Sequence, residues 1–415
     1  MVTASTRTTT SWRPLPFAAL RVRNYRIFFV GQLVSVSGTW MESVAQAFLV
    51  LQLTDSGSQL GLVTAARFGP MFLLGPWGGM LADRLDDRKV LLLTQPVAGL
   101  ISLAYAALIA THVINLPLVY LLSLGLGFVS VLDNPARQSL IPSLVPRDRL
   151  LNAVSLNSVT MNVARILGAA FGGVLAAGLG LTLCFLVNAL SFMAVVASLL
   201  LMRVSEIAVR TRDSGGPGQV RAGFDYVRRR PDLAIPLLLV TVAGVFAWEF
   251  PVSLPLMAER VFHGTAATYG SMTAAMGLGG VFGGLVAASR NRLRLQSLAL
   301  AGLGWGAAIT VAALAPNLVT EYVVLVLVGY GSITFNSAAK TTLQLRTAPA
   351  LRGRVMSLWG LAWLGSTPLG SPIIGAIGEH LNPRYGLLVG GVTTAVVSLA
   401  VLPRLRALDR IETAT

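Results

Sequence analysis

The chain is dominated by long apolar segments that recur from residue 27 to residue 404. Each is long enough to cross the ~30 Å hydrocarbon core of a membrane as a helix. Of the 415 residues, 54% are hydrophobic and 12% are charged, which is about half the charged share of a soluble domain. The pattern therefore predicts an all-α polytopic membrane protein and excludes a string of two or three soluble domains. Twelve transmembrane helices are expected, at 27–51, 57–82, 89–111, 115–139, 150–177, 180–202, 233–258, 266–289, 294–314, 318–345, 351–378 and 385–404.

The distribution of basic residues predicts how the chain is oriented. The formal net charge is +15, which in a soluble protein would suggest a nucleic-acid partner. Here 28 of the 32 Lys and Arg residues lie on the side of the N-terminus, two lie on the opposite side, and two lie within helices. The positive-inside rule then places both termini in the cytoplasm and requires an even number of helices. We therefore expect a multi-pass protein of the bacterial inner membrane, surrounded by the lipid bilayer, with no nucleic-acid partner.

The longest polar segment, at 203–232, divides the expected helices into two sets of six. We predict an N-terminal half at 1–202, a cytoplasmic central loop at 203–232 and a C-terminal half at 233–415. Similar phrases recur about 202 residues apart, for example the glycine-rich stretches at 168–173 and 370–375. The halves therefore look like repeats. This predicts a substrate site between them near the midplane, and alternating access by rocking of the halves.

The most specific motif, GGMLADRLDDRK at 78–89, joins the second and third expected helices. It resembles the G-x-L-A-D-R-x-G-R-K loop of the major facilitator superfamily. The resemblance covers nearly the whole chain and implies the fold of that superfamily, with twelve helices in two pseudo-symmetric halves. It assigns a cytoplasmic gate to four residues, Gly79, Asp83, Arg84 and Arg88, of which the glycine permits close helix packing and the charged residues bridge or cap neighbouring helices. The chain departs from the pattern at residues 86 and 87, which are both aspartates.

Two charges on the fourth expected helix extend this gate. Asp133 and Arg137 are four residues apart, so they share one helix face near the same membrane surface. The resemblance pairs Asp133 with Arg84 or Arg88, because intramembrane carboxylates rarely stay unpaired. The alternative is that water and lipid headgroups satisfy these helix-end charges.

The fifth expected helix carries Gly168, Gly172 and Gly173, which resemble the antiporter motif G-P-x-x-G-G, with Ala169 in place of the proline. In the superfamily this motif marks exporters. The alternative is a packing face of small residues with no further role. The phrases LDNPAR at 132–137, LLNA at 150–153 and RGRVMSL at 352–358 resemble the drug and siderophore exporter branch of the superfamily.

Four charged residues fall at a similar depth, ~22 Å from the cytoplasmic ends of their helices. They are Glu42, Arg67, Arg165 and Glu249. A lone charge at that depth is costly, so each should pair, face water or be neutralised. We expect Glu42 to exchange protons, with Glu249 as the second candidate, and the two arginines to pair with Glu42 or to contact anionic groups of the substrate. A fixed salt bridge between Glu42 and Arg67 is the alternative.

Polar and aromatic side chains near these charges suit an amphipathic substrate cavity, mostly apolar with a few polar groups. For each aromatic residue, packing against lipid or another helix is the alternative. The cavity candidates are Trp40, Gln46, Asn157, Trp248, Phe250 and Asn336.

The sequence carries no enzyme signature. The G-x-x-x-x-G-K-[ST] phosphate-binding loop is absent, and the three histidines have no metal-site spacing. We therefore expect no metal and no cofactor, with a proton gradient as the energy source. The predicted function is secondary-active export of a small amphipathic molecule by proton antiport, by a monomer. The alternatives are a siderophore exporter and, from another class, a membrane receptor or channel that does not transport.

Overall fold

The structure, a computed structural model, describes residues 17–82, 84–208, 219–289, 294–348, 351–363 and 365–414. All regular secondary structure in these ranges is helical. Of the predicted site residues, Asp83 lies outside the described residues, and the surroundings of Gly79 lie outside the described side chains.

The N-terminal set contains six long helices. Two of them begin at capped positions: Asp86 accepts a hydrogen bond from the Lys89 backbone N–H, and Asn115 accepts one from Leu118. Asp86, one of the two aspartates that depart from the superfamily loop pattern, thus caps the start of the third helix. The helices are α1 (Arg23–Thr54), α2 (Gly57–Ala82), α3 (Asp87–Ala110), α4 (Leu116–Ser143), α5 (Leu150–Gly178) and α6 (Leu181–Leu200), with short 3₁₀ turns at Ala18–Arg21, Arg147–Arg149 and Val204–Glu206.

The C-terminal set is less regular than predicted. It contains α7 (Gln219–Arg228), α8 (Pro231–Val242), the π-helical turn η4 (Ala243–Ala247), α9 (Phe250–Leu256), the π-helical turn η5 (Met257–Val261), α10 (Ala266–Ser289), α11 (Leu295–Ala313), α12 (Leu318–Arg346), α13 (Arg352–Trp363), α14 (Thr367–His380) and α15 (Pro383–Ala414). The expected helix at 233–258 is interrupted at η4, and α9 then begins with a proline in its first turn. Because proline has no N–H to donate, an α-helical ladder tends to stop before it.

Two further predicted boundaries were wrong. The expected helix at 351–378 consists of two pieces, α13 and α14, and α14 also has a proline in its first turn. The last helix continues to Ala414, beyond the predicted end at residue 404, although it contains Pro403. A prediction from hydropathy ends each helix where the sequence becomes polar. A helix that continues past the membrane surface is therefore predicted too short.

Nine helical stretches of the described residues are long and apolar enough to span a membrane. The remaining expected crossings coincide with α1, α2 and the pair formed by α13 and α14. The chain is therefore an all-α membrane protein, and its helices are consistent with the predicted twelve crossings.

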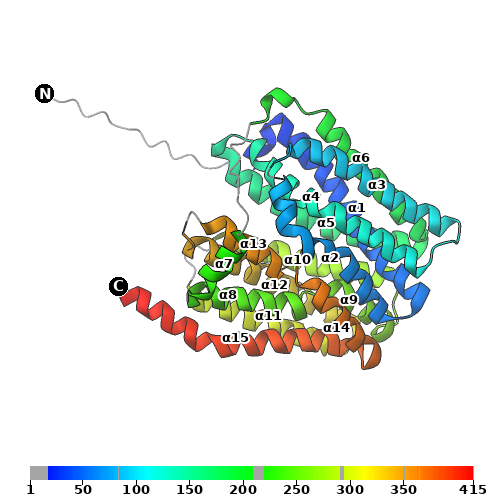
Figure 1. Cartoon of the computed structure of the whole chain (residues 1–415). Coiled ribbons are helices and arrows are strands. Elements are labelled where there is room, and N and C mark those ends of the chain that lie inside the picture. The colour runs from blue at the N-terminus through cyan, green and yellow to red at the C-terminus, as the bar shows by residue number, and fades with distance from the viewer. Residues whose placement is uncertain are drawn as a thin grey trace.

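In space, α1 to α6 lie together and α8 to α15 lie together (Figure 1). The two sets meet mainly where α5 packs on α10 and α2 packs on α14. These contacts depend on small residues. A Cβ atom at Gly61 would come within 2.3 Å of the Ser371 carbonyl oxygen, and one at Gly173 within 2.6 Å of the Ala266 carbonyl oxygen. In the predicted orientation, all of these positions are near the extracytoplasmic ends of their helices.

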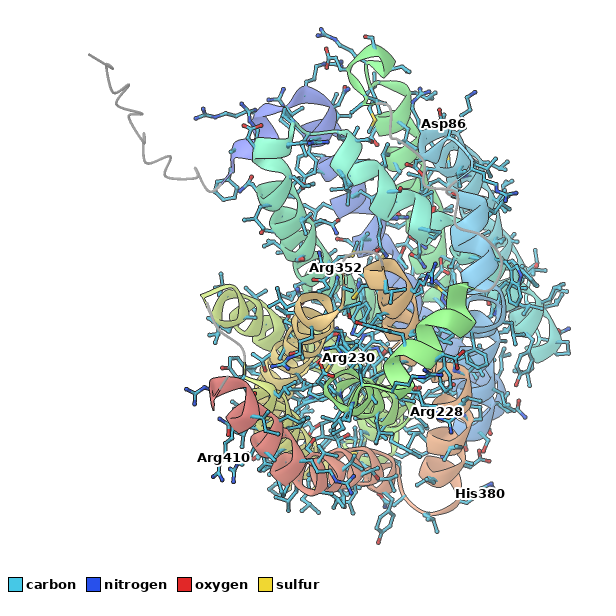
Figure 2. The ribbon with its side chains drawn as sticks, turned by 60° about the vertical axis from the view of Figure 1, so that its left-hand side comes forward. Asp86, Arg228, Arg230, Arg352, His380 and Arg410 are labelled. Atoms are coloured by element: carbon cyan, nitrogen blue, oxygen red, sulfur yellow. The ribbon has the colours of Figure 1, made fainter. Side chains whose placement is uncertain are left out.

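The part of the central loop that the structure describes includes α7, which packs on the C-terminal set. Val227 is buried with Leu233, Val355 and Leu358, which come from α8 and α13. Figure 2 labels Arg228 at the end of α7, Arg230 shortly after it and Arg352 at the start of α13. The described part of the loop is therefore attached to α8 and α13.

Candidate transport site

Glu42 is buried in the middle of the N-terminal set, with 1% of its surface exposed. Its Oε2 accepts hydrogen bonds from the Ser102 hydroxyl of α3 and the Asn188 amide of α6. Arg67, on α2, has its Nη1 atom 3.9 Å from Oε1. Neither of those two atoms has a hydrogen-bond partner among the described residues. One oxygen of Glu42 is thus held firmly, and the other faces a cation across a distance too long for a hydrogen bond.

Gln46 lies one turn along α1 and joins a second polar cluster. Its amide donates to the Tyr105 hydroxyl at 3.1 Å and to the Ser123 hydroxyl at 2.6 Å. The Tyr105 hydroxyl in turn donates to the Val119 carbonyl at 3.0 Å. These partners all lie inside the N-terminal set, on α3 and α4.

Sequence reasoning missed Ser102, Tyr105 and Asn188. A signal was available for the first two. Ser102 and Tyr105 are three residues apart on one apolar helix, and Glu42 and Gln46 are four apart on another, so each pair lies on one helix face. Nothing in the sequence indicated that these two faces pack together.

Arg165 lies where the two sets meet and does not pair with Glu42. It is 5% exposed, and its Nη2 atom donates to the Asn162 side chain at 3.2 Å and to the Met276 carbonyl of α10 at 3.4 Å. Its guanidinium carbon lies 5.8 Å from the centre of the half-buried Trp40 ring. Of the two arginines predicted at mid-depth, only Arg67 therefore pairs with Glu42.

Glu249 is the second buried carboxylate of the predicted site. It precedes α9 directly, is 1% exposed, and neither of its oxygens has a hydrogen-bond partner among the described residues. The backbone of α14 lies close, because a Cβ atom at Gly370 would come within 2.9 Å of Oε1. An ionised carboxylate without partners is strongly disfavoured in such a site.

The predicted aromatic residues of the C-terminal set form one cluster. The half-buried Trp248 ring lies 4.5 Å from Trp363, 6.0 Å from Phe250 and 6.4 Å from Trp305, measured between ring centres. Phe250 is buried and belongs to the core of the set. The two predicted asparagines, Asn157 on α5 and Asn336 on α12, are half-buried.

The predicted gate is organised around Asp133 and Arg137. Their side chains form an ion pair of 2.5 Å within α4, and Asp133 also accepts hydrogen bonds from Thr94 and Gln95 of α3 at 2.8 and 2.6 Å. Arg88, one of the two partners that the resemblance suggested for Asp133, donates from its Nε atom to the Leu199 carbonyl of α6 at 2.9 Å. The i,i+4 spacing already brings Asp133 and Arg137 together on one helix face.

Arg84, a further basic residue of the loop motif, is exposed. The described contacts of Asp133 come from Thr94 and Gln95 of α3 and from Arg137 of α4.

The glycines of the antiporter-like motif pack α5 against two helices. A Cβ atom at Gly168 would come within 2.1 Å of the Ser37 carbonyl oxygen of α1, and one at Gly172 within 2.7 Å of the Met41 Cα atom. Gly173 faces α10. In the other half, a Cβ atom at Gly370 would similarly meet the Val245 carbonyl oxygen at 1.9 Å. Gly168 and Gly370 therefore make matching contacts with the first membrane-spanning stretch of their own set. That stretch is α1 in the N-terminal set and α8 with η4 in the C-terminal set.

Sequence reasoning also missed a polar connection between the sets, which we call the outer latch: Asp55, Ser56, Ser58, Arg260 and Glu379. Glu379 accepts hydrogen bonds from the Ser56 hydroxyl and the Ser58 backbone N–H, both at 2.7 Å. These hydrogen bonds lower the pKa of the Glu379 carboxyl to about 2. Arg260 pairs with Asp55 at 3.0 Å. The turn between α1 and α2 is thus held from both sides by the C-terminal set.

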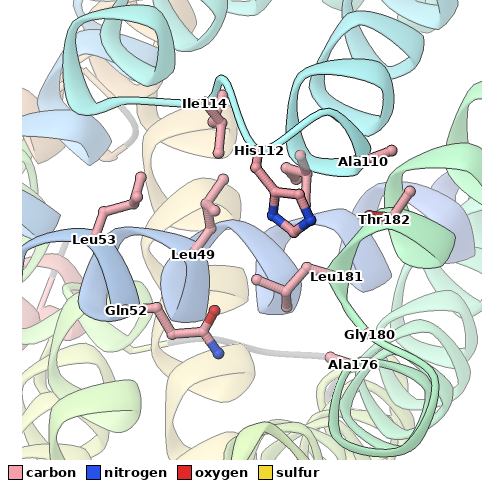
Figure 3. Close-up of a pocket in the computed structure, with 11 residues that line it drawn as sticks. Leu49, Gln52, Leu53, Ala110, His112, Ile114, Ala176, Gly180, Leu181 and Thr182 are labelled. Atoms are coloured by element: carbon pink, nitrogen blue, oxygen red, sulfur yellow. The ribbon is translucent and has the colours of Figure 1, made fainter.

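A cavity of about 690 Å³ opens at the outer ends of α1, α3, α5 and α6 (Figure 3). Gln52, His112 and Leu181 are among the residues that line it. None of the predicted site residues does, so this cavity is separate from the site predicted at mid-depth.

Comparison with known proteins agrees with this architecture. A family model described as a transmembrane secretion effector matches residues 14–415. Enterobactin exporters of Escherichia coli O1:K1 and Shigella boydii serotype 18 are 29% and 28% identical to this chain, over 92% of its length and 93% of theirs.

Solved transporter structures share the fold. A bacterial homolog of the human lysosomal transporter Spinster, in an inward-facing and unoccupied conformation, has a TM-score of 0.71 at 16% identity, covering 92% of this chain and 96% of that one. The nucleoside transporter NupG has a TM-score of 0.73 at 13% identity, covering 92% and 99%. Both similarities concern the fold alone. The chain belongs to the transmembrane secretion effector family and is a membrane transporter, not an enzyme, with the major facilitator fold.

Proposed function

We propose that this transporter exports a small amphipathic molecule in exchange for protons, and that Glu42 carries the proton. The proposal rests on the difference between the surroundings of the two carboxylate oxygens of Glu42. Two hydrogen bonds fix Oε2, whereas Oε1 faces Arg67 at 3.9 Å without a hydrogen bond. A fixed structural salt bridge would normally be shorter and hydrogen-bonded on both sides.

Such an arrangement suits a group that changes charge during a cycle. When Glu42 is ionised, it balances the charge of Arg67, and when it is protonated, Arg67 is left without its counter-ion. Arg67 is half-buried, not fully buried, so it then favours water or an anionic group of the substrate. Glu249 is the second candidate, because it is fully buried and lacks partners among the described residues.

Transport in this proposal moves the two helix sets relative to each other. The close contacts of α2 with α14 and of α5 with α10 lie toward one end of the bundle. With both termini in the cytoplasm, that end is extracytoplasmic, and export requires these contacts to open. The protein acts as a monomer, since each half supplies its own buried carboxylate.

The decisive test is Glu42→Gln in proteoliposomes with a pH gradient. Substrate-driven proton movement should fall at least about tenfold, because the amide keeps the shape but cannot be ionised. Glu206→Gln, an exposed residue that pairs with Arg203 at 3.1 Å, is the matched control and should behave as wild type. Proton flux in Glu42→Gln equal to that of the control would rule out Glu42, and the same assay on Glu249→Gln would then decide the second candidate.

A second candidate function is export of a siderophore. Both relatives named above are enterobactin exporters that match over nearly their full length. Export of iron-free and iron-loaded siderophores from cells lacking their own exporters would separate this function from general drug efflux.

A further inference from the structure

Four side chains of the C-terminal set, two of them neighbours on α13, make up what we call the aromatic ladder: Lys340, Trp359, Trp363 and Trp248. Trp359 and Trp363 are one turn apart on α13 and so lie on one face of that helix. The Trp363 ring centre lies 4.5 Å from that of Trp248 at the end of η4. At the other end, the Lys340 ammonium of α12 lies 5.1 Å from the centre of the Trp359 ring.

Part of the ladder is exposed, and fully buried aromatic rings lie next to it. Lys340 is exposed, and Trp359 and Trp248 are half-buried. Behind them, Trp305 and Phe335 are fully buried, with ring centres 6.1 and 6.5 Å from that of Trp363. Rigid aromatic surfaces of this kind bind flat apolar groups at a low cost in conformational entropy.

Polar atoms along the ladder are left unsatisfied. The Trp359 indole N–H is buried without a hydrogen-bond partner among the described residues, and so is the side-chain oxygen of Asn336, one turn before Lys340 on α12. Buried polar groups are normally paired, so each exception requires an explanation. A bound molecule with hydrogen-bonding groups would supply the missing partners.

The accessible charge of the ladder is positive. Lys340 forms no ion pair with any acidic residue among those the structure describes. Glu249, next to Trp248 in sequence, is 1% exposed and so is not presented to a ligand at the surface of the ladder. Tryptophan faces alone would favour cations, but an uncompensated ammonium within the ladder opposes them and attracts anions.

We propose that the aromatic ladder is a binding subsite for planar aromatic compounds that carry a negatively charged group. The ring lies against Trp248 and Trp359, and the anionic group lies at Lys340. This inference rests on the proposed export function and names the chemical class of the exported molecule.

The test is equilibrium binding to the purified full-length protein in detergent, without any gradient. Three probes share one ring system: naphthalene-2-sulfonate, naphthalene-2-methanol and trimethyl-(2-naphthyl)ammonium. The sulfonate should bind at least about tenfold more tightly than the other two. Lys340→Gln should abolish this preference, Lys340→Arg should keep it, and Trp359→Leu should weaken the binding of all three probes.

The control is Lys89→Gln, because Lys89 is exposed at the start of α3 and is the chain's other lysine. It should keep the wild-type order of affinities. If the Lys340 variants do not fold, the wild-type protein still gives an answer: sulfonate affinity should fall between about 0.1 and about 1 M salt, whereas methanol affinity should not.

Several results would overturn the proposal: no binding of any probe, equal affinities, tightest binding of the cation, or a Lys340→Gln variant that matches Lys89→Gln. Because binding is measured at equilibrium, the proton role of Glu42 is judged separately. Loss of the sulfonate preference leaves antiport intact, and unchanged proton flux in Glu42→Gln leaves the subsite intact.

Discussion

At the scale of single residues, Glu42 is the centre of a buried polar cluster in the N-terminal set. Glu42 receives hydrogen bonds from two helices that are distant in sequence, through Ser102 and Asn188. The nearby cluster of Gln46, Tyr105 and Ser123 is satisfied internally. The two donors therefore hold the Glu42 carboxylate in one orientation beside Arg67.

Asn188→Ala should therefore slow proton-driven transport several-fold. Without the amide donor, Oε2 of Glu42 keeps only the Ser102 hydrogen bond, and the carboxylate is no longer fixed beside Arg67. Ser123→Ala is the control, because its hydroxyl belongs to the Gln46 cluster and does not contact Glu42. The measurement is the rate of proton-driven transport in vesicles under one fixed pH gradient. Equal rates for the two variants would show that Asn188 does not position Glu42.

At the scale of helices, close packing between the sets depends on positions where any side chain would collide with backbone. Gly61 of α2 is such a position, since its added Cβ atom would lie 2.3 Å from the Ser371 carbonyl oxygen of α14. Eight residues later in the same helix, Gly69 has nothing within 4 Å. The same substitution should therefore have opposite consequences at the two sites.

Gly61→Ala should separate α2 from α14 and destabilise the observed conformation by about 1–3 kcal/mol. Gly69→Ala should be neutral or slightly stabilising, because alanine favours the helix more than glycine does. Thermal unfolding of both variants in the same detergent gives the comparison. A melting temperature for Gly61→Ala at or above that of Gly69→Ala would contradict the packing described above.

The helices themselves were largely predictable, and the contacts between them were not. Hydropathy and basic-residue counts predict helix positions because the membrane imposes its length and charge asymmetry on every crossing. Glu42, Arg67, Arg165 and Glu249 were recognisable because buried charges are rare in apolar helices. Their partners were not, since the pairing of Glu42 with Asn188 depends on how α1 and α6 meet in space. The resemblance likewise placed Asp133 in a gate and missed its pairing with Arg137.

At the scale of the whole molecule, the outer latch joins the two sets at the end that the predicted orientation places outside the cytoplasm. Glu379, at the end of α14, binds the turn that begins α2. Since hydrogen bonds lower the pKa of its carboxyl to about 2, the stabilisation is complete above the ordinary carboxyl pKa of about 4.3. It is lost only as the pH falls from there through about 2. Acidification to pH 5 should therefore leave the latch closed.

Glu379→Ala should open the outer end more often. A cysteine placed at Ser371, which is fully buried beside Gly61, reports this through labelling by a membrane-impermeant thiol reagent, with Cys184 replaced by alanine. Labelling should rise several-fold in Glu379→Ala and less in Glu379→Gln, whose amide oxygen still accepts a hydrogen bond. In the parent, labelling relative to that of the denatured protein at the same pH should be equal at pH 7 and pH 5, because any thiol reacts more slowly at the lower pH. A rise in this relative labelling at pH 5 would show that protonation releases the latch.

The interruptions in the C-terminal set have a mechanical consequence. The π-helical turn η4 lies against α13 and its continuation, where a Cβ atom at Gly244 would come within 2.4 Å of the Ala362 carbonyl oxygen. The corresponding helices of the N-terminal set, α1 and α5, run without a break. The two halves share similar sequence phrases but differ in stiffness. These two helices of the N-terminal set are unbroken, whereas their counterparts in the C-terminal set are interrupted at η4 and between α13 and α14. We expect bending during the cycle to concentrate at these interruptions, at residues 243–249 and at the start of α14, while the first six helices tilt as a unit.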